Sequence, residues 1–376
     1  MDYKKLDLIK ELNMKNPKLL KLLIGFDGFV DEIIHVVDKR IDSESFKRID
    51  TIEDLANRIK KASGLSTNIE LVPMVKKIGG NGPIMCNAMS KAVDDIIYIG
   101  SLGYPTINDV FHSLEEKVKL YTIENPGHSD ALEFDDGKLI LGKMNSLANV
   151  TYEQLISVVK EEDLKNMISE ADMFATVNWS MLPNMTDLWR KLLKNIISSL
   201  PKKNVRPFMF VDLADPEKRE KHEIVEALNL LKEFNCYFRV VLGLNKKEAY
   251  DVANVLDLFD DSSLKNMQVS LEDLNQAMFE YLDIYSVVIH PVDRSCCVVD
   301  GVFYEETGPY VEKPKLTTGA GDNFNAGFML GMLLGLKPDL ALLTGMSTSG
   351  FYVRNARSPK FDELITFIGD WHENLI

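Results

Sequence analysis

Between Lys315 and Leu336 the sequence reads KLTTGAGDNFNAGFMLGMLLGL, in which a glycine-rich turn runs directly into an apolar helix. The turn from Thr317 to Gly321 lets successive backbone N–H groups converge, and the following helix adds its own unpaired N–H groups and its positive dipole end. This pattern predicts an anion-binding loop. Asp322 stands at the rim of that loop, where a carboxylate is suited to take a proton from a hydroxyl that attacks a phosphate. The alternative is an acidic first turn that serves only the stability of the helix.

The size and charge of the chain limit the classes of protein to consider. It has 376 residues, of which 45% are hydrophobic, so it is long enough for one large α/β domain or two ordinary ones. Its formal net charge of -14 argues against a nucleic-acid surface, because neutralising phosphates needs clustered Lys and Arg. A local basic pocket for the phosphates of a small molecule remains compatible with this charge.

The cysteine spacing and the length of the apolar runs indicate the cellular compartment of the protein. The four cysteines show no C-x-x-C spacing, which favours a reducing cytosol. The first 20 residues lack the apolar core and cleavage site of a signal peptide. The longest nearly apolar run, Gly327 to Leu336, is far shorter than the roughly 20 residues that cross a bilayer. We therefore expect a soluble, cytoplasmic protein with no nucleic-acid or membrane partner.

Apolar strands and amphipathic helices alternate along the chain. Strands are predicted at residues 21–26, 96–100, 173–178, 207–212, 237–242 and 286–290, and helices at 153–169, 187–200 and 217–234. Such alternation predicts an α/β fold with a doubly wound, mostly parallel central sheet flanked by helices. The pair Asp136-Gly137 predicts a hairpin. Residues 33–71 read as a long connection that contains one exposed helix.

Candidate substrate ligands follow the first predicted strand and a later glycine cluster. Asp27 and Asp31 come after residues 21–26, at an edge where ligands gather in α/β sheets, although either could be an ordinary turn carboxylate. Gly79 and Gly80, with Gly82, allow the backbone to approach a ligand closely. A purely structural turn explains these glycines equally well.

Polar residues also follow the later strands. Asn178 and Asp212 each stand at a strand end and therefore point toward a common crevice. Asn245 and Glu248 are spaced as the N-cap and N3 residues of a helix, which predicts a capping box. That structural role is compatible with a second role in ligand binding.

The longer string TTGAGDNFNAGF resembles the signature of the ribokinase-like (pfkB) carbohydrate kinases. The resemblance implies that Asp322 is the catalytic base and that the backbone of Gly319, Ala320 and Gly321 forms the anion hole. The match covers about residues 20 to 358. GGNGPIMCNAMSKAV resembles the family's glycine-glycine substrate motif, and Asn245-x-x-Glu248 resembles its N-x-x-E motif.

These matches imply a set of binding residues. Substrate is expected at Asp31, with Asp27 as a close rival, and at Gly79, Gly80 and Asn81. Nucleotide is expected at Asn245, Thr318, Gly319 and Gly321. Asn245 and Glu248 are expected to place Mg²⁺, through its bound water if not directly.

The resemblance also implies a domain organisation. Residues 20–358 are expected to form the kinase domain, with the elements of a small β lid within 32–75 and 104–145. Residues 1–19 are expected to be an N-terminal helical extension and residues 359–376 a C-terminal helix. Lid strands in this family often pair between subunits, so the resemblance also admits a homodimer.

The chain departs from the family pattern at three places. Ile84 stands where an Asn commonly touches the sugar, and Leu316 stands where an Asp often belongs to a monovalent-cation site. His290-Pro291-Val292 replaces a Thr-x-Gly that meets the nucleotide phosphates. Among further candidates, Arg219 resembles a family arginine near the transfer site, and His128 is read as a turn residue that could touch substrate.

These observations predict an ATP- and magnesium-dependent phosphotransferase that moves the γ-phosphoryl group of ATP to a hydroxyl of a sugar or sugar-like substrate. Positioning and electrostatic stabilisation dominate such chemistry. The alternatives are a nucleoside kinase and a non-catalytic, ligand-binding member of the same fold. The retained Asp322 and N-x-x-E pair favour catalysis.

Overall fold

The computed structural model describes residues 3–376 and is built around a nine-stranded sheet in the order β14-β13-β12-β11-β10-β9-β1-β5-β6. Its strands are β1 (Lys21–Phe26), β5 (Asp95–Gly100), β6 (Lys119–Thr122), β9 (Met173–Val177), β10 (Phe208–Asp212), β11 (Arg239–Leu244), β12 (Ser286–Ile289), β13 (Arg294–Val299) and β14 (Val302–Thr307). Neighbouring strands from β12 to β6 pair in parallel. β13 pairs antiparallel with both β12 and β14, and β14 forms one edge of the sheet.

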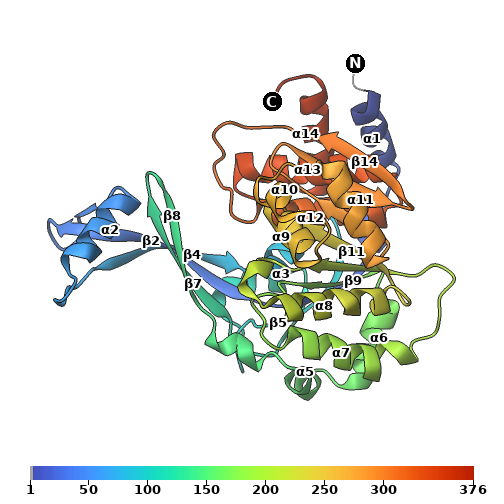
Figure 1. The fold of residues 1–376 in the computed structure, drawn as a ribbon, viewed down its shortest axis with the longest axis horizontal. Coiled ribbons are helices and arrows are strands. Elements are labelled where there is room, and N and C mark those ends of the chain that lie inside the picture. The colour runs from blue at the N-terminus through green and yellow to red at the C-terminus, as the bar shows by residue number, and fades with distance from the viewer. Residues whose placement is uncertain (1–2) are drawn as a thin grey trace.

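Helices cover both faces of this sheet (Figure 1). The helices are α1 (Tyr3–Asn13), α3 (Asn81–Met89), α4 (His112–Glu115), α5 (Tyr152–Val158), α6 (Glu161–Glu170), α7 (Met185–Asn195), α8 (Lys221–Phe234), α9 (Lys246–Val255), α10 (Asp261–Lys265), α11 (Leu271–Leu282), α12 (Ala320–Leu333), α13 (Pro338–Asn355) and α14 (Phe361–His372). Leu23 of β1 belongs to the core on one face of the sheet, with residues of α5 to α9 and α11. Its neighbours Leu22 and Ile24 belong to the core on the other face, with residues of α3, α12 and α13. Side chains alternate between the faces of a strand, so a strand buried on both faces is apolar throughout. The predicted doubly wound α/β fold is confirmed.

A second, five-stranded sheet projects from the body as a lid (Figure 1). It contains β2 (Phe29–Arg40), β3 (Phe46–Arg48), β4 (Leu71–Gly79), β7 (Gly127–Phe134) and β8 (Gly137–Lys143), with α2 (Ile52–Lys61) packed on its outer part. A small core of its own holds this part together, formed by Ile34, Val36, Ile49, Leu55, Leu132 and Phe134. The lid is therefore a separate packing unit joined to the body through strands.

Two sequence expectations in the lid are wrong. The connection predicted after Asp31 is in fact the 12-residue strand β2, and His128 lies on β7 opposite Val30 instead of in a turn. Polar residues such as Glu32 and Asp38 interrupt the apolar pattern of β2. Pairing with β4 and β7 determines this strand, and such long-range pairing is not visible in a local pattern.

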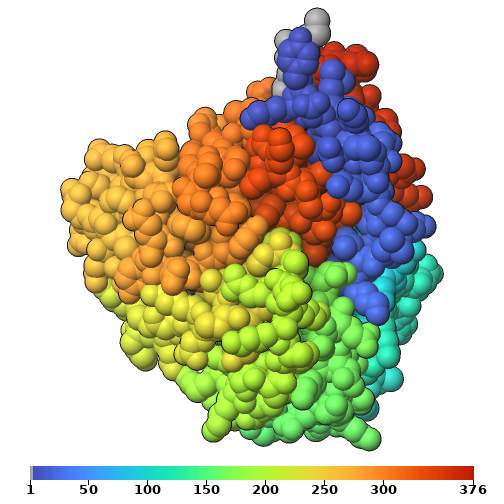
Figure 2. Space-filling model, turned by 90° about the vertical axis from the view of Figure 1, so that its right-hand side faces the viewer, coloured from blue at the N-terminus to red at the C-terminus, as the bar shows by residue number. Residues whose placement is uncertain are grey.

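The two ends of the chain lie together. Leu8 and Leu12 of α1 pack with Leu364 and Ile368 of α14 and with the start of α13. Figure 2 shows α1, in blue, against the C-terminal part of the chain, in red. No helix within residues 3–376 is long and apolar enough to span a membrane.

Candidate active site

The glycine-rich loop leads into α12 as expected from its sequence. Gly319 is the N-cap residue of α12 and has φ 88°, in the left-handed region that glycine tolerates best. The Ala320 N–H donates to the carbonyl of Thr317 (3.1 Å), so it completes a turn inside the loop. Asp322 follows in the first turn of α12 and is almost fully buried, with 9% of its surface exposed.

Asp322 is oriented by the other glycine motif. The Asn81 amide at the start of α3 donates to Asp322 Oδ1 (2.9 Å). Burial raises the pKa of Asp322 well above its ordinary value, the Asp212 and Asp27 carboxylates add to the rise, and the Asn81 hydrogen bond opposes it. Two motifs that are 241 residues apart therefore meet at one carboxylate.

Asp27 and Asp31 have different surroundings, although they are only four positions apart. Asp27 is fully buried (0% exposed) and accepts hydrogen bonds from the Gly82 N–H (2.9 Å) and the Asn178 amide (2.7 Å). Burial raises its pKa to about 6, while these hydrogen bonds oppose the rise. The protein itself thus uses the Asp27 carboxylate to hold the turn at Gly80 and Gly82.

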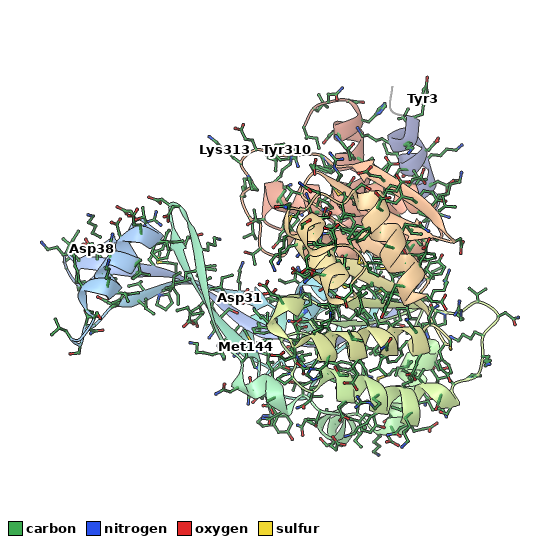
Figure 3. The ribbon with its side chains drawn as sticks, viewed as in Figure 1. Tyr3, Asp31, Asp38, Met144, Tyr310 and Lys313 are labelled. Atoms are coloured by element: carbon green, nitrogen blue, oxygen red, sulfur yellow. The ribbon has the colours of Figure 1, made fainter. Side chains whose placement is uncertain are left out.

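Asp31 is more open. It lies on β2 where the lid leaves the body (Figure 3), and its carboxylate packs so closely on Gly79 that a Cβ there would lie 2.2 Å from Asp31 Oδ1. Burial raises the pKa of Asp31, and its sheet neighbours Lys77 and Ser129 oppose that rise. Of the two carboxylates, Asp31 is therefore the more accessible.

The capping box predicted after β11 is present. Asn245 Oδ1 accepts from the Glu248 N–H (2.9 Å), and Glu248 Oε2 accepts from the Asn245 N–H (2.8 Å). The Glu248 carboxylate also lies near the carboxylates of Asp212, Asp215 and Asp322. Burial and Asp212 raise the pKa of Glu248 to about 9.

Asp212, at the end of β10, completes this acidic group. It accepts hydrogen bonds from the Ala214 N–H (2.6 Å) and the Asn325 amide (2.9 Å), and burial raises its pKa to about 6. Within residues 3–376, neither Asp212 nor Glu248 has a salt-bridge partner. A buried carboxylate, Asp212, and a half-buried one, Glu248, without a counter-ion match the oxygen ligands that Mg²⁺ prefers. The described chain offers no group of three or more acidic, His or Cys side chains for a metal, so such an ion would keep several waters.

A cavity of about 350 Å³ opens beside the first turn of α12. Its lining combines Asn245, Thr317, Ala320 and Gly321 of the predicted nucleotide motifs with an apolar wall, formed by Val292, Pro309, Val311, Pro314, Phe324, Met346 and Val353. This combination, with polar groups at one end and apolar side chains at the other, is typical of a small-molecule pocket. A larger groove of about 770 Å³, between α7 and α8, contains none of the predicted site residues.

The residues that depart from the family pattern have clear positions. The His290 ring lies 4.7 Å from the Phe324 ring, beside Gly321, and burial lowers its pKa to about 4. Ile84 packs against the backbone of Gly319. Of the three departures, Ile84 and His290 therefore lie beside the glycine-rich loop as neutral groups.

Arg219 does not point freely into the site. Its guanidinium pairs with Glu223 (2.8 Å) and lies 4.7 Å from the Trp179 ring. It also donates to the carbonyl oxygens of Leu182 and Pro183. Arg219 therefore ties the start of α8 to the loop after β9.

Some residues near the site were not singled out from the sequence. Tyr98 donates to the carbonyl of Asp27 (2.6 Å), and Tyr352 donates to the carbonyl of Thr318 (2.8 Å). Both tyrosines lie in regular elements with apolar patterns, so no local signal distinguishes them from core residues.

Solved structures of several sugar kinases share this fold. A ribokinase of Arabidopsis thaliana, complexed with ribose and ATP, matches with a TM-score of 0.59 at 14% identity, over 94% of this chain and 99% of that one. A carbohydrate kinase of Agrobacterium tumefaciens matches with a TM-score of 0.60 at 15% identity, over 93% of this chain and 97% of that one. The fold is that of the ribokinase-like kinases, as the sequence resemblance implied.

The sequence comparison narrows the class. A ketohexokinase of Haloferax volcanii is 26% identical over 349 residues, which are 92% of this chain and 90% of that one. The sequence model of the prokaryotic ketohexokinase family matches residues 11–371, so the chain belongs to that family. The prediction of an ATP-dependent sugar kinase is confirmed at this level.

Proposed function

We propose that this chain phosphorylates a ketohexose, with Asp322 as the general base. The observation that carries the proposal is the position of the Asp322 carboxylate, which is buried at the first turn of α12 and oriented by Asn81. A carboxylate with a raised pKa is a stronger base once it is deprotonated, which suits it to take the proton of an attacking hydroxyl. The family and the ketohexokinase relative support the ketose as acceptor.

The sugar is expected to lie between the lid and the start of α3. Asp31 and Asn81 offer an acceptor and an amide for sugar hydroxyls, and both are close to the backbone of Gly79 or Gly80. Asp27 acts indirectly, since it holds the turn at Gly82 (2.9 Å). Closing the lid over the sugar would exclude water from the transfer site.

The nucleotide is expected in the cavity beside α12. Its phosphates would approach the N-terminal backbone of α12, where unpaired N–H groups and the helix dipole stabilise negative charge. Glu248, Asp212 and Asn245 would hold Mg²⁺, which when bound neutralises charge on the phosphates. The neutral His290 ring and Phe324 line the cavity there.

The test is sugar phosphorylation by the purified protein with ATP and Mg²⁺, measured against fructose, glucose, ribose and inosine. We expect turnover with the ketohexose and a loss of about a hundredfold or more in kcat in Asp322→Asn. Asp339→Asn is the matched control, because Asp339 lies in the first turn of α13 and serves no predicted site.

Each other outcome favours a different function. Turnover of inosine alone would indicate a nucleoside kinase. No turnover with any acceptor, together with a raised melting temperature in the presence of fructose, would indicate a ligand-binding protein. Equal kcat in Asp322→Asn and the wild type would disprove the role of Asp322 as the base.

A further inference from the structure

The loop between β14 and α12 forms one side of the nucleotide cavity. It runs from residue 308 to residue 319 without a helix or strand, and Pro309, Tyr310, Val311, Pro314 and Thr317 line the cavity. Its outer side is exposed, with 64% of Tyr310 accessible, and Figure 3 shows Tyr310 and Lys313 along it. A loop without internal regular structure needs outside contacts to keep one conformation.

The last turn of α13 supplies these contacts. Tyr352 Oη donates to the carbonyl of Thr318 (2.8 Å), at the α12 end of the loop. Arg354 donates through Nη1 to the carbonyl of Pro309 (2.9 Å) and through Nη2 to that of Tyr310 (2.8 Å), at the β14 end. Two side chains two residues apart therefore hold the two ends of one loop.

The backbone fits α13 closely at the same place. A Cβ on Gly350 would lie 2.5 Å from Pro309 Cγ. A Cβ on Gly308 would lie 1.9 Å from Cε of Met346, which also belongs to α13. These close approaches keep Pro309 against the helix, where the Arg354 guanidinium reaches its carbonyl.

We propose that Tyr352 and Arg354 are positioning residues with separate tasks. Tyr352 sets the end of the loop that meets the transferring phosphoryl group, and Arg354 sets the end that forms the wall of the nucleotide pocket. This inference rests on the proposed kinase function and adds two residues to it.

The task of Tyr352 follows from peptide geometry. The C=O and N–H of one trans peptide point in opposite directions, so a hydrogen bond to the Thr318 carbonyl also fixes the direction of the Gly319 N–H. Gly319 is the N-cap of α12, and its left-handed backbone has many alternatives once released. Tyr352 is 8% exposed, so without its hydroxyl the Thr318 carbonyl would lose a buried partner.

The task of Arg354 follows from the shape of its side chain. A guanidinium presents parallel N–H groups and can reach two neighbouring carbonyl oxygens, whereas a lysine ammonium is a single point. Arg354 also donates to the carbonyl of Gly350 (2.9 Å) within its own helix, which holds the side chain in place. Losing this fork would loosen Pro309 and Tyr310 without touching Thr318.

The experiment compares two conservative variants with two matched controls. Tyr352→Phe is expected to lower kcat about tenfold and to leave KM for ATP within about twofold, because phosphoryl transfer is affected and pocket shape is not. Arg354→Lys is expected to raise KM for ATP about tenfold with kcat nearly unchanged. Calorimetric titration of Arg354→Lys with ATP should show the same weakening in Kd, without any turnover.

The controls remove the same kinds of bond elsewhere. Tyr250→Phe removes a hydroxyl that donates to the carbonyl of Val269 (2.5 Å). Arg206→Lys replaces a guanidinium that donates to the carbonyl of Asn235. Both are expected to keep wild-type kcat and KM.

Two results would overturn the inference while the wild type turns over normally. One is that Tyr352→Phe and Arg354→Lys both match their controls. The other is that each variant changes kcat and KM for ATP together, as general loosening would do. Absence of turnover in the wild type with every sugar would instead count against the proposed function, and the ATP titration would still test Arg354.

Discussion

At the scale of single residues, Asp322 is unusual because it is buried with other carboxylates and hydrogen-bonded by an amide. Because its pKa is raised, Asp322 stays protonated to a higher pH than an ordinary aspartate. Only its deprotonated form can accept the proton of a sugar hydroxyl. The pH dependence of activity therefore reports directly on this residue.

We expect kcat/KM to rise with pH, and the midpoint of this rise should lie above the ordinary pKa of an aspartate. The reason is that burial and the Asp212 carboxylate raise the pKa of Asp322. In Asn81→Ala this rise should move to higher pH, since the Asn81 hydrogen bond lowers the pKa of Asp322. Steady-state kinetics across pH would measure the rise in both proteins. If the rise in kcat/KM occurred at the same pH in Asn81→Ala as in the wild type, Asp322 would not be the group that titrates.

Glu248 offers a second prediction at this scale, on stability. Its folded-state pKa is about 9, above the ordinary value of about 4.3, so folding favours the protonated form. The contribution of Glu248 to the free energy of unfolding is therefore complete at low pH and is lost as pH rises toward 9. In Glu248→Gln, which keeps an oxygen for the Asn245 N–H, Tm measured without Mg²⁺ should exceed the wild-type value by roughly 2 °C at pH 8 and match it near pH 4.

In the control for this prediction, the expected change in Tm at pH 8 has the opposite sign. Glu223 also caps a helix, but its hydrogen-bonded ion pair with Arg219 lowers its pKa. Its ionised form therefore stabilises the folded state above its ordinary pKa, and this contribution is lost as pH falls. We expect Glu223→Gln to lower Tm at pH 8. If both variants moved Tm in the same direction, the proposed electrostatic cause would be wrong.

At the scale of elements, the glycines on either side of α12 allow a paired test. Gly319 and Gly335 both have positive φ, 88° and 72°. A Cβ on Gly319 would lie 3.0 Å from Tyr352 Oη and 3.2 Å from Ile84, whereas a Cβ on Gly335 would meet nothing within 4 Å. The two positions share backbone strain and differ in crowding.

We expect Gly335→Ala to lower the free energy of unfolding by about 1 kcal/mol and to leave kcat unchanged. Gly319→Ala should destabilise by at least as much and should lower kcat at least tenfold, because the anion-binding loop must shift away from Tyr352 and Ile84. Chemical denaturation and steady-state kinetics measure the two effects. Wild-type kcat in Gly319→Ala would show that the loop tolerates this shift.

At the scale of the whole molecule, the lid and the body have separate cores. The lid core is small and includes Leu55 of α2, the helix that lies at the outer end of the lid (Figure 1). A small unit of this kind can open without unfolding of the body. Because Asp31 lies on the strand that joins the two parts, opening of the lid should affect sugar binding.

Leu55→Ala, in the lid core, should abolish hydrogen-exchange protection across the lid strands and raise KM for the sugar several-fold, with little change in the main thermal transition. The comparison is Leu228→Ala in the body core, which should lower Tm clearly, since such deletions cost about 2–5 kcal/mol. Hydrogen exchange with mass spectrometry separates the two outcomes. Equal loss of protection in the body of Leu55→Ala would mean that lid and body unfold together.

Features that depend on local pattern could be predicted from the amino-acid sequence. The alternation of apolar strands and helices predicted the doubly wound sheet, because a strand buried on both faces must be apolar along its length. The glycine-rich turn before α12 and the Asn245-Glu248 capping box were also predicted, since both are set by residues within a few positions of one another. The resemblance to the ribokinase-like kinases depended on the same short motifs.

The tertiary structure alone decided the features that depend on residues far apart in the chain. It buried Asp27, which accepts a hydrogen bond from Asn178, and left Asp31 partly exposed. It placed the Asp212 carboxylate where it raises the pKa of Glu248, and it made β2 a strand by pairing it with β4 and β7. It also brought the end of α13 onto the loop before α12. Burial and charge environment are sums over such distant neighbours, so residues of the same type four positions apart can have different roles.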